Sequence, residues 1–193
     1  MTLSRARRSL SLIGLFCFAS LTATAQEPQA KKSSVPLTKD QLSIYETFLH
    51  NWQEGSKSPL NVANTTDSFI PEADELQGCM KDFPRKSRAI ETHQFPDDLA
   101  NEQIRLLNPA EYKVPAMSDL MNQKRNLDDT VETMVNAGLM SLSEIIFSQD
   151  HRLAALQYSF QCGSRCGTGG TLIYEKRSGL WKKSRRRCSF WQS

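Results

Sequence analysis

Cys162 and Cys166 are the residues whose type and spacing could most directly do chemistry, since two thiols are separated by only three residues. As free thiols they could ligate a soft metal such as Cu(I), with a histidine as the third ligand. They could also cycle as a redox pair, because the positive charge of Arg165 between them would lower a thiol pKa. The alternative is a structural disulfide that closes a hairpin loop, with glycines at the positions that need a positive φ. We expect the disulfide, since redox pairs more often have two intervening residues at a helix start, and we expect no metal and no other cofactor.

The N-terminus has the three parts of a secretory signal peptide. Three arginines between positions 5 and 8 precede the apolar stretch Leu10–Leu21, and Ala23 and Ala25 are small residues of the kind that a signal peptidase reads. We expect residues 1–25 to be removed and the protein to be periplasmic or secreted. The apolar stretch is shorter than the roughly 20 residues that span a bilayer. No later stretch approaches that length, so we expect a soluble mature protein without a transmembrane segment.

Four cysteines remain beyond the signal peptide, namely Cys79, Cys162, Cys166 and Cys188. An even number in an oxidising compartment favours disulfides over metal thiolates. We favour a bond between Cys162 and Cys166 through a tight loop, which leaves Cys79 to pair with Cys188 and to link the two halves of the chain. In the alternative arrangement, Cys188 pairs with one member of the close pair across neighbouring strands.

A cluster of basic residues near the C-terminus is the second candidate site, and Trp181, Phe190 and Trp191 flank it. Such a cluster could bind lipid headgroups, lipopolysaccharide or an acidic partner protein. The alternative is an edge strand on which Lys and Arg prevent pairing with other sheets, and charges on both faces of the strand fit an edge. The cluster consists of Lys176, Arg177, Lys182, Lys183, Arg185, Arg186 and Arg187.

Overall charge argues against nucleic-acid binding. The chain has 24 Lys and Arg against 21 Asp and Glu, and three of the basic residues lie in the signal peptide, which leaves equal numbers. A protein that binds nucleic acid through bulk electrostatics is normally clearly basic. An envelope protein or an anionic surface remains as the kind of partner to expect.

No catalytic motif is present in the sequence. His50 lies between Glu46 and Glu54 on a predicted helix, where solvated pairs are commoner than a metal site. His93 and His151 have no ligand-like spacing, and the sequence contains no zinc-protease, serine-hydrolase, P-loop or dinucleotide motif. We therefore name no catalytic residue and lean against an enzyme.

The first secondary-structure element is an amphipathic helix that follows a flexible leader over residues 26–37. Thr38 is a helix N-cap, Gln41 completes a capping box, and Gly55 can end the helix. Apolar residues at spacings of three and four form one stripe along it. The stripe consists of Leu42, Tyr45, Phe48, Leu49 and Trp52.

The middle of the chain predicts fewer regular elements. Residues 60–66 favour a short strand, residues 69–99 favour loops and short helical turns, and residues 102–107 favour another short element. A central helix is expected over 118–137, with Gly138 after its end. Its expected buried set is Leu120, Met121, Leu127, Val131, Met134 and Val135.

The C-terminal part predicts an antiparallel sheet. Residues 139–148, 151–162, 171–176 and 180–191 favour strands, with 163–170 as a loop, and short connections require antiparallel pairing. Ala154, Leu156, Tyr158, Phe160 and Cys162 alternate and should share one face. The fold class is thus α+β, a single disulfide-stabilised domain over 38–193 with a four-stranded meander over 138–193.

The C-terminal run also resembles a known module. Its pattern is a strand with Ala-Leu-x-Tyr, a Cys-Gly-x-x-Cys-Gly-x-Gly loop, a Glu-Lys strand, Gly-x-Trp-Lys and a final Trp-x-Ser. The matching residues are Ala155, Leu156, Tyr158, Cys162, Gly163, Cys166, Gly167, Gly169, Glu175, Lys176, Gly179, Trp181, Lys182, Trp191 and Ser193. This resembles the C-terminal module of a family of exported bacterial proteins without an assigned activity. The resemblance implies a fold but no catalytic residues, and the sequence departs from it in the basic run 182–187 and in Cys188.

Three functions follow as expectations. The first is a non-enzymatic periplasmic binding or interaction module, stabilised by disulfides. The second is a copper- or thiol-handling protein that uses Cys162 and Cys166. The third is an envelope protein whose basic C-terminal strand binds an anionic lipid or partner.

Overall fold

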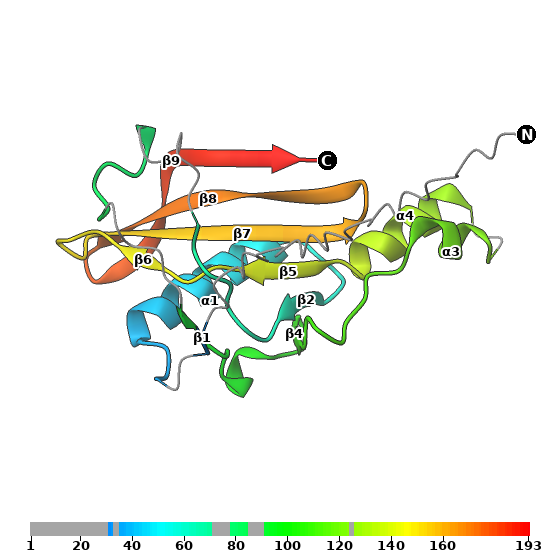
Figure 1. Ribbon diagram of the computed structural model, residues 1–193, viewed down its shortest axis with the longest axis horizontal. Helices are drawn as coiled ribbons and strands as arrows, with labels where there is room; N and C mark the ends of the chain where they lie inside the picture. Colours follow the sequence, from blue (N-terminus) through cyan, green and yellow to red (C-terminus); the bar gives the residue numbers. More distant parts are fainter. Residues whose placement is uncertain (1–30, 33–34, 71–77, 85–90, 124–125) are drawn as a thin grey trace, which may run out of the picture.

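The computed structural model describes residues 31–32, 35–70, 78–84, 91–123 and 126–193 (Figure 1). The expected signal peptide, residues 1–25, lies outside the described residues. Within the expected leader, residues 26–37, β1 (Lys31–Lys32) pairs in parallel with β3 (Glu91–Thr92), and Leu37 is buried.

Helix α1 (Lys39–Gln53) confirms the capping-box prediction. Two reciprocal hydrogen bonds cap its first turn. The Gln41 N–H donates to the Thr38 hydroxyl oxygen at 3.3 Å, and the Thr38 N–H donates to the Gln41 side-chain oxygen at 2.9 Å. These bonds satisfy two of the N–H groups that a helix start leaves without an intrahelical partner. One face of the helix is buried through Ile44, Tyr45, Phe48 and Leu49.

A seven-stranded mixed sheet carries the rest of the fold, in the order β4-β2-β5-β7-β8-β9, with β6 also paired to β7. β2 lies parallel to both β4 and β5, whereas β5 to β9 pair antiparallel. Figure 1 shows α1 across one face of this sheet and β9 along its margin. The strands are β2 (Leu60–Ala63), β4 (Ile104–Leu107), β5 (Leu139–Leu142), β6 (Ile146–Phe147), β7 (Leu153–Gly163), β8 (Cys166–Arg177) and β9 (Leu180–Gln192).

The α+β class is confirmed, but the four-stranded meander is wrong in detail. The strand expected over 139–148 is broken into β5 and β6, because the Ser143 hydroxyl takes the place of a ladder partner and accepts the Gln157 N–H at 2.9 Å. The loop expected over 163–170 is only two residues long, since β8 begins at Cys166. The sheet also continues beyond β5 into the parallel strands β2 and β4.

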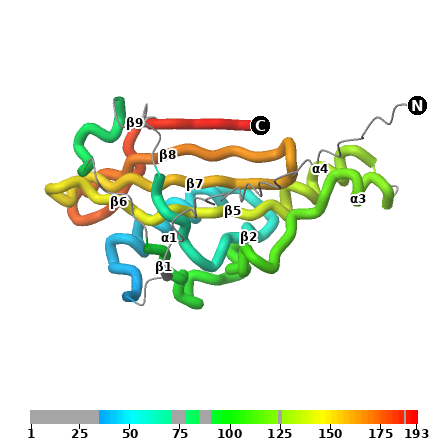
Figure 2. The backbone as a smooth tube through the Cα atoms, in the orientation of Figure 1, coloured from blue at the N-terminus to red at the C-terminus, as the bar shows by residue number. Residues whose placement is uncertain are grey.

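The single central helix is also corrected. Two helices are present, α3 (Met117–Met121) and α4 (Leu127–Asn136), and both lie beyond one end of the strands (Figure 2). Only Leu120 and Met134 of the expected buried set are buried. The other four are exposed because α4 turns Thr130 and Met134 inward, which leaves the neighbouring stripe to the solvent. They are Met121, Leu127, Val131 and Val135.

The sheet buries side chains on both faces. The main core lies between α1 and the sheet, and the alternation predicted for β7 is confirmed, since Ala154, Leu156, Tyr158, Phe160 and Cys162 all face it. A smaller cluster covers the opposite face at one end, where the segment 78–84 packs on the strands. Its buried members are Phe69, Met80, Phe83, Ile146, Ala155 and Ile173. None of the helices in the described ranges is long and apolar enough to cross a bilayer.

Candidate functional site

The basic cluster lies mainly on β9, which is the last strand of the sheet. β9 is joined to β8 by the two-residue turn Ser178-Gly179, in which φ is 51° and 81°. Both values are positive, as a type I′ turn requires, and this turn matches the twist of the strands that it joins. The other side of β9 pairs with no strand of the described chain.

Three of the cluster's cations are held in ion pairs. The Lys176 Nζ lies 2.8 Å from an Asp40 carboxylate oxygen and 5.3 Å from the centre of the Trp181 ring. The hydrogen bond from Lys176 holds the pKa of Asp40 below its ordinary value. Arg177 pairs with Glu175 at 2.7 Å. These contacts stabilise the hairpin and its packing on α1, and the charges of these two cations are largely neutralised.

Arg186 is the third paired cation, and it belongs to the anchor of β9. Its guanidinium lies 3.0 Å from an Asp82 oxygen, in the segment that the Cys79–Cys188 disulfide ties to the strand. Met80 and Phe83 of the same segment are buried against the sheet. β9 is therefore fixed from one face by a disulfide, an ion pair and apolar packing together.

Lys182, Lys183 and Arg185 remain, and all three are exposed. None of them forms an ion pair with any residue that the structure describes. Lys183 stands opposite Tyr174, a residue of the core under α1, whereas Lys182 stands opposite Glu175. Successive residues of a strand point to opposite faces, so the free cations project from both faces of the edge. The side chain of Arg187 lies outside what the structure describes.

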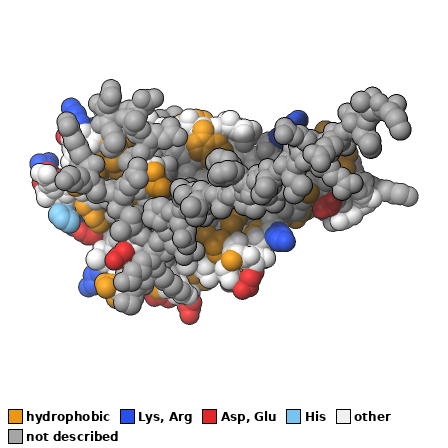
Figure 3. Space-filling view, viewed as in Figure 1, with side chains coloured by type: hydrophobic (Ala, Val, Ile, Leu, Met, Phe, Trp, Pro, Cys, Tyr) orange, Lys and Arg blue, Asp and Glu red, His pale blue; other side chains and the backbone are white. Residues whose placement is uncertain are grey.

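Exposed apolar residues accompany these cations on β9. Leu180, Phe190 and Trp191 are 63%, 62% and 42% exposed. Trp191 lies over Gly169 so closely that a Cβ there would overlap its ring. Hydrophobic side chains reach the surface where Figure 1 places β9, as the space-filling view shows (Figure 3).

The cysteines form the pairing favoured from the sequence. Cys162 is bonded to Cys166 and Cys79 to Cys188, with Cα atoms 5.0 and 5.2 Å apart. The bonded sulfurs of Cys162 and Cys166 present no thiolate to a metal. Among the described residues, no group of three or more His, Cys, Asp or Glu side chains is placed to hold a metal ion.

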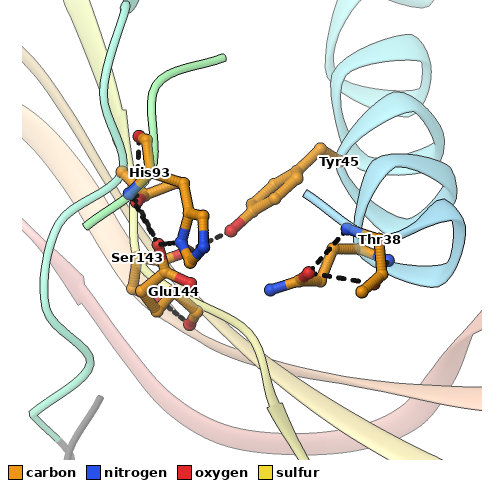
Figure 4. A network of polar contacts seen from close by, with 7 residues as sticks. Thr38, Tyr45, His93, Ser143 and Glu144 are labelled. Carbon is orange, nitrogen blue, oxygen red and sulfur yellow. Dashed lines mark hydrogen bonds and ion pairs between the residues drawn. The ribbon is translucent and has the colours of Figure 1, made fainter. Parts of the chain in front are cut away.

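A buried polar cluster around Glu144 is a site that the sequence did not predict (Figure 4). Its carboxylate is almost fully buried, and one oxygen lies 2.7 Å from the His93 Nδ1. The same oxygen accepts the His93 backbone N–H at 3.0 Å and the hydroxyl of Thr66. Nearby, the Tyr45 hydroxyl donates to the Ser143 carbonyl at 2.8 Å. Burial, and then the charge of Glu144, raise the pKa of Tyr45 well above its ordinary value.

The chemistry open to this cluster follows from its hydrogen bonds. In the neutral tautomer that donates from Nδ1 to the carboxylate, the imidazole has a lone pair on Nε2, the atom that a general base or a metal ligand would use. Within the described ranges, no group of three or more His, Cys, Asp or Glu side chains is placed to hold a metal ion here. The bonds tie the β3 segment to the break between β5 and β6, so the cluster stabilises the scaffold.

One feature of the sequence could have indicated this cluster: Glu144 is the only charged residue in the largely apolar run 139–147. The other two histidines lie elsewhere. His50 lines a pocket with Glu46 and Asp98, and the His151 ring stacks on Phe147 with the ring centres 5.3 Å apart.

No family model, no curated protein and no solved structure matches this chain. The functional argument therefore proceeds from the geometry of the described residues.

Proposed function

We propose that the protein is a non-enzymatic exported module, periplasmic or secreted, that binds an anionic partner through the basic edge strand β9. The observation that carries this proposal is the exposure of Lys182, Lys183 and Arg185 on the outermost strand, without ion-pair partners in the described chain. Lys176 and Arg177 differ from these three, because both are held in ion pairs within the hairpin and with α1.

The expected strength of such binding can be bounded. Each Lys or Arg close to an anionic surface contributes about 1 kcal/mol at physiological salt. Three cations would then contribute about 3 kcal/mol, or roughly a hundredfold in the dissociation constant. The attraction weakens as salt is added, because it falls off within a Debye length of about 8 Å at 0.15 M.

The rigidity of β9 supports the same role. The Cys79–Cys188 disulfide and the Arg186–Asp82 pair fix the backbone of the strand from one face, so the strand that carries the cations is in place before a partner arrives. A binding surface ordered in advance loses less conformational entropy on association.

The copper- or thiol-handling alternative uses the same C-terminal half but needs different chemistry. It requires free thiols at Cys162 and Cys166, which the structure joins in a disulfide. A reducing step would have to precede any metal binding there, and nothing in the described residues supplies one.

Vesicles and charge-matched variants test the proposed function. Binding to vesicles with about one third anionic lipid, and to immobilised polyglutamate, is compared for the native protein and for Lys182→Ser/Lys183→Ser/Arg185→Ser. The control is Lys39→Ser/Lys57→Ser/Lys113→Ser, which removes three exposed cations from other parts of the molecule. We expect the β9 variant to lose about a hundredfold in affinity for at least one of the two polyanions, with the control close to native. Equal losses in the two variants, or no salt-sensitive binding by the native protein, would contradict the proposal.

A further inference from the structure

The outer edge of β9 offers backbone groups as well as charges. The turn at Ser178-Gly179 makes Arg177 and Leu180 the closing pair of the hairpin. In an antiparallel ladder, residues alternate between bonding to the neighbouring strand and pointing away from it. The N–H and C=O groups of Trp181 and Lys183 therefore point away from β8, toward a side where no strand of the described chain lies.

Two irregularities in the pairing with β8 divide this edge into two regular runs, one at residues 184–186 and one at Cys188, which stands between the partners of Leu172 and Thr171. Lys183 stands opposite Tyr174 and Arg187 opposite Leu172, so residues 184–186 of β9 face Ile173 alone. The first regular run, 180–183, is basic, whereas the second, 189–192, carries Phe190 and Trp191. Bulges commonly protect edges from indiscriminate pairing. Here the interrupted register leaves two runs of different chemistry on one edge.

In the second run, 189–192, the backbone groups that point away from β8 can be identified as well. Ser193 exchanges backbone hydrogen bonds of 3.0 and 3.4 Å with Gly167, which turns these groups toward β8. The groups of Gln192 then point outward by the same alternation. Both runs thus present donors and acceptors along one open edge.

The placement of the cations distinguishes between kinds of anionic partner. Lys182 and Lys183 project from opposite faces of the sheet. A membrane surface would meet the cations of one face only. An added strand carries its own side chains alternately on both faces, about 4.5–5.5 Å from the residues opposite. Carboxylates on such a strand would meet cations on both faces.

We propose that the partner is an extended acidic polypeptide segment that pairs with β9 as an additional strand of the sheet. This inference rests on the proposed function, since it specifies the partner of the same strand. The backbone bonds of strand addition supply affinity, and the side chains on either face supply specificity. Acidic residues of the segment pair with the run 180–183, and apolar residues pack beside Phe190 in the run 189–192.

The test uses a ten-residue synthetic peptide with glutamates in one half and valines and threonines in the other. Its reversed sequence covers the second strand orientation, and a version methylated at every backbone nitrogen keeps the charges but cannot donate to the edge. We expect one orientation to bind with at least tenfold higher affinity than its methylated version. We also expect the peptide to slow amide hydrogen exchange at Trp181 and Lys183 at least tenfold, while exchange at Leu180 and Lys182, which bond to β8, stays unchanged.

The outcomes separate this inference from the function on which it rests. Equal binding of the methylated peptide, or unchanged exchange at Trp181 and Lys183, would overturn strand addition. Salt-sensitive binding to anionic vesicles without binding to either peptide would also overturn it, yet would leave the proposed function standing. Loss of vesicle, polyglutamate and peptide binding alike would overturn both.

Discussion

Two regions of the molecule hold charged side chains in opposite ways. Around Glu144 the charge is buried, and its hydrogen bonds come from His93 and Thr66, distant in the sequence. Along β9 the cations Lys182 and Lys183 are exposed and lack ion pairs within the described residues, while a disulfide holds their strand. A buried charge is tolerated only when it is hydrogen-bonded or paired, so a buried carboxylate of this kind indicates a role in the fold. An exposed charge without a partner costs little to keep and remains available for binding.

Removal of the anchor of β9 should have the largest effect on stability. Cys79→Ala/Cys188→Ala opens a link across 109 residues, and the chain-entropy model gives a loss of about 5 kcal/mol in the free energy of unfolding. The matched control, Cys162→Ala/Cys166→Ala, opens a link across four residues and should cost about 2 kcal/mol. Urea unfolding measures both. Equal losses would mean that β9 is held mainly by its ladder with β8.

Removal of the buried carboxylate should come next. Glu144→Ala removes the buried carboxylate that the His93 ring and the Thr66 hydroxyl share, and leaves the His93 N–H only the Thr66 oxygen at 2.7 Å. We expect a loss of about 2–5 kcal/mol in the free energy of unfolding. Glu144→Gln keeps an acceptor oxygen and should lose less. Folded Glu144→Gln should bind anionic vesicles as the native protein does. Weakened binding by this variant at full folding would show that the two regions do not act separately.

The smallest effect is expected at a partly exposed ion pair. The pKa of Asp40 lies below its ordinary value of 3.8, so the folded state favours the charged carboxylate. Its contribution to stability is present above pH 3.8 and is lost as the pH falls through the lowered pKa. Because both partners are partly exposed, Asp40→Asn should cost less than about 1 kcal/mol at pH 7. Urea unfolding of the variant and the native protein should converge as the pH falls below the lowered pKa of Asp40, and a difference that does not shrink on acidification would contradict this origin.

Local patterns explain which parts of the fold could be predicted. The capping box of Thr38 and Gln41 and the alternation in β7 act between near neighbours, and the structure confirms both. The stripe on α4 shows the limit of this reasoning. Periodicity correctly places Leu127 and Val131 on one face, yet it does not say whether that face meets protein or solvent.

Contacts between distant residues explain the remaining differences. His93 gave no signal because its partner, Glu144, lies 51 residues along the chain. The parallel pairing of β2 with β5 and β4 also joins segments that are distant in the sequence. No short hairpin turn connects these strands, so the sequence does not indicate that they pair. The residues of the basic cluster were identified from the sequence, but their division into paired and unpaired cations depends on Asp40 and Asp82, which only the fold brings near Lys176 and Arg186.

The two disulfides are nested, and this order affects how the chain can mature. Cys162 bonds to Cys166 inside the interval that Cys79 and Cys188 enclose. In a chain that crosses a membrane N-terminus first, Cys79 emerges long before its partner, and the next thiol to appear is that of Cys162. In such a chain, oxidation in order of appearance would join a wrong pair, so the native bonds would require either that oxidation of Cys79 wait for the last strand or that a disulfide isomerase correct the bond.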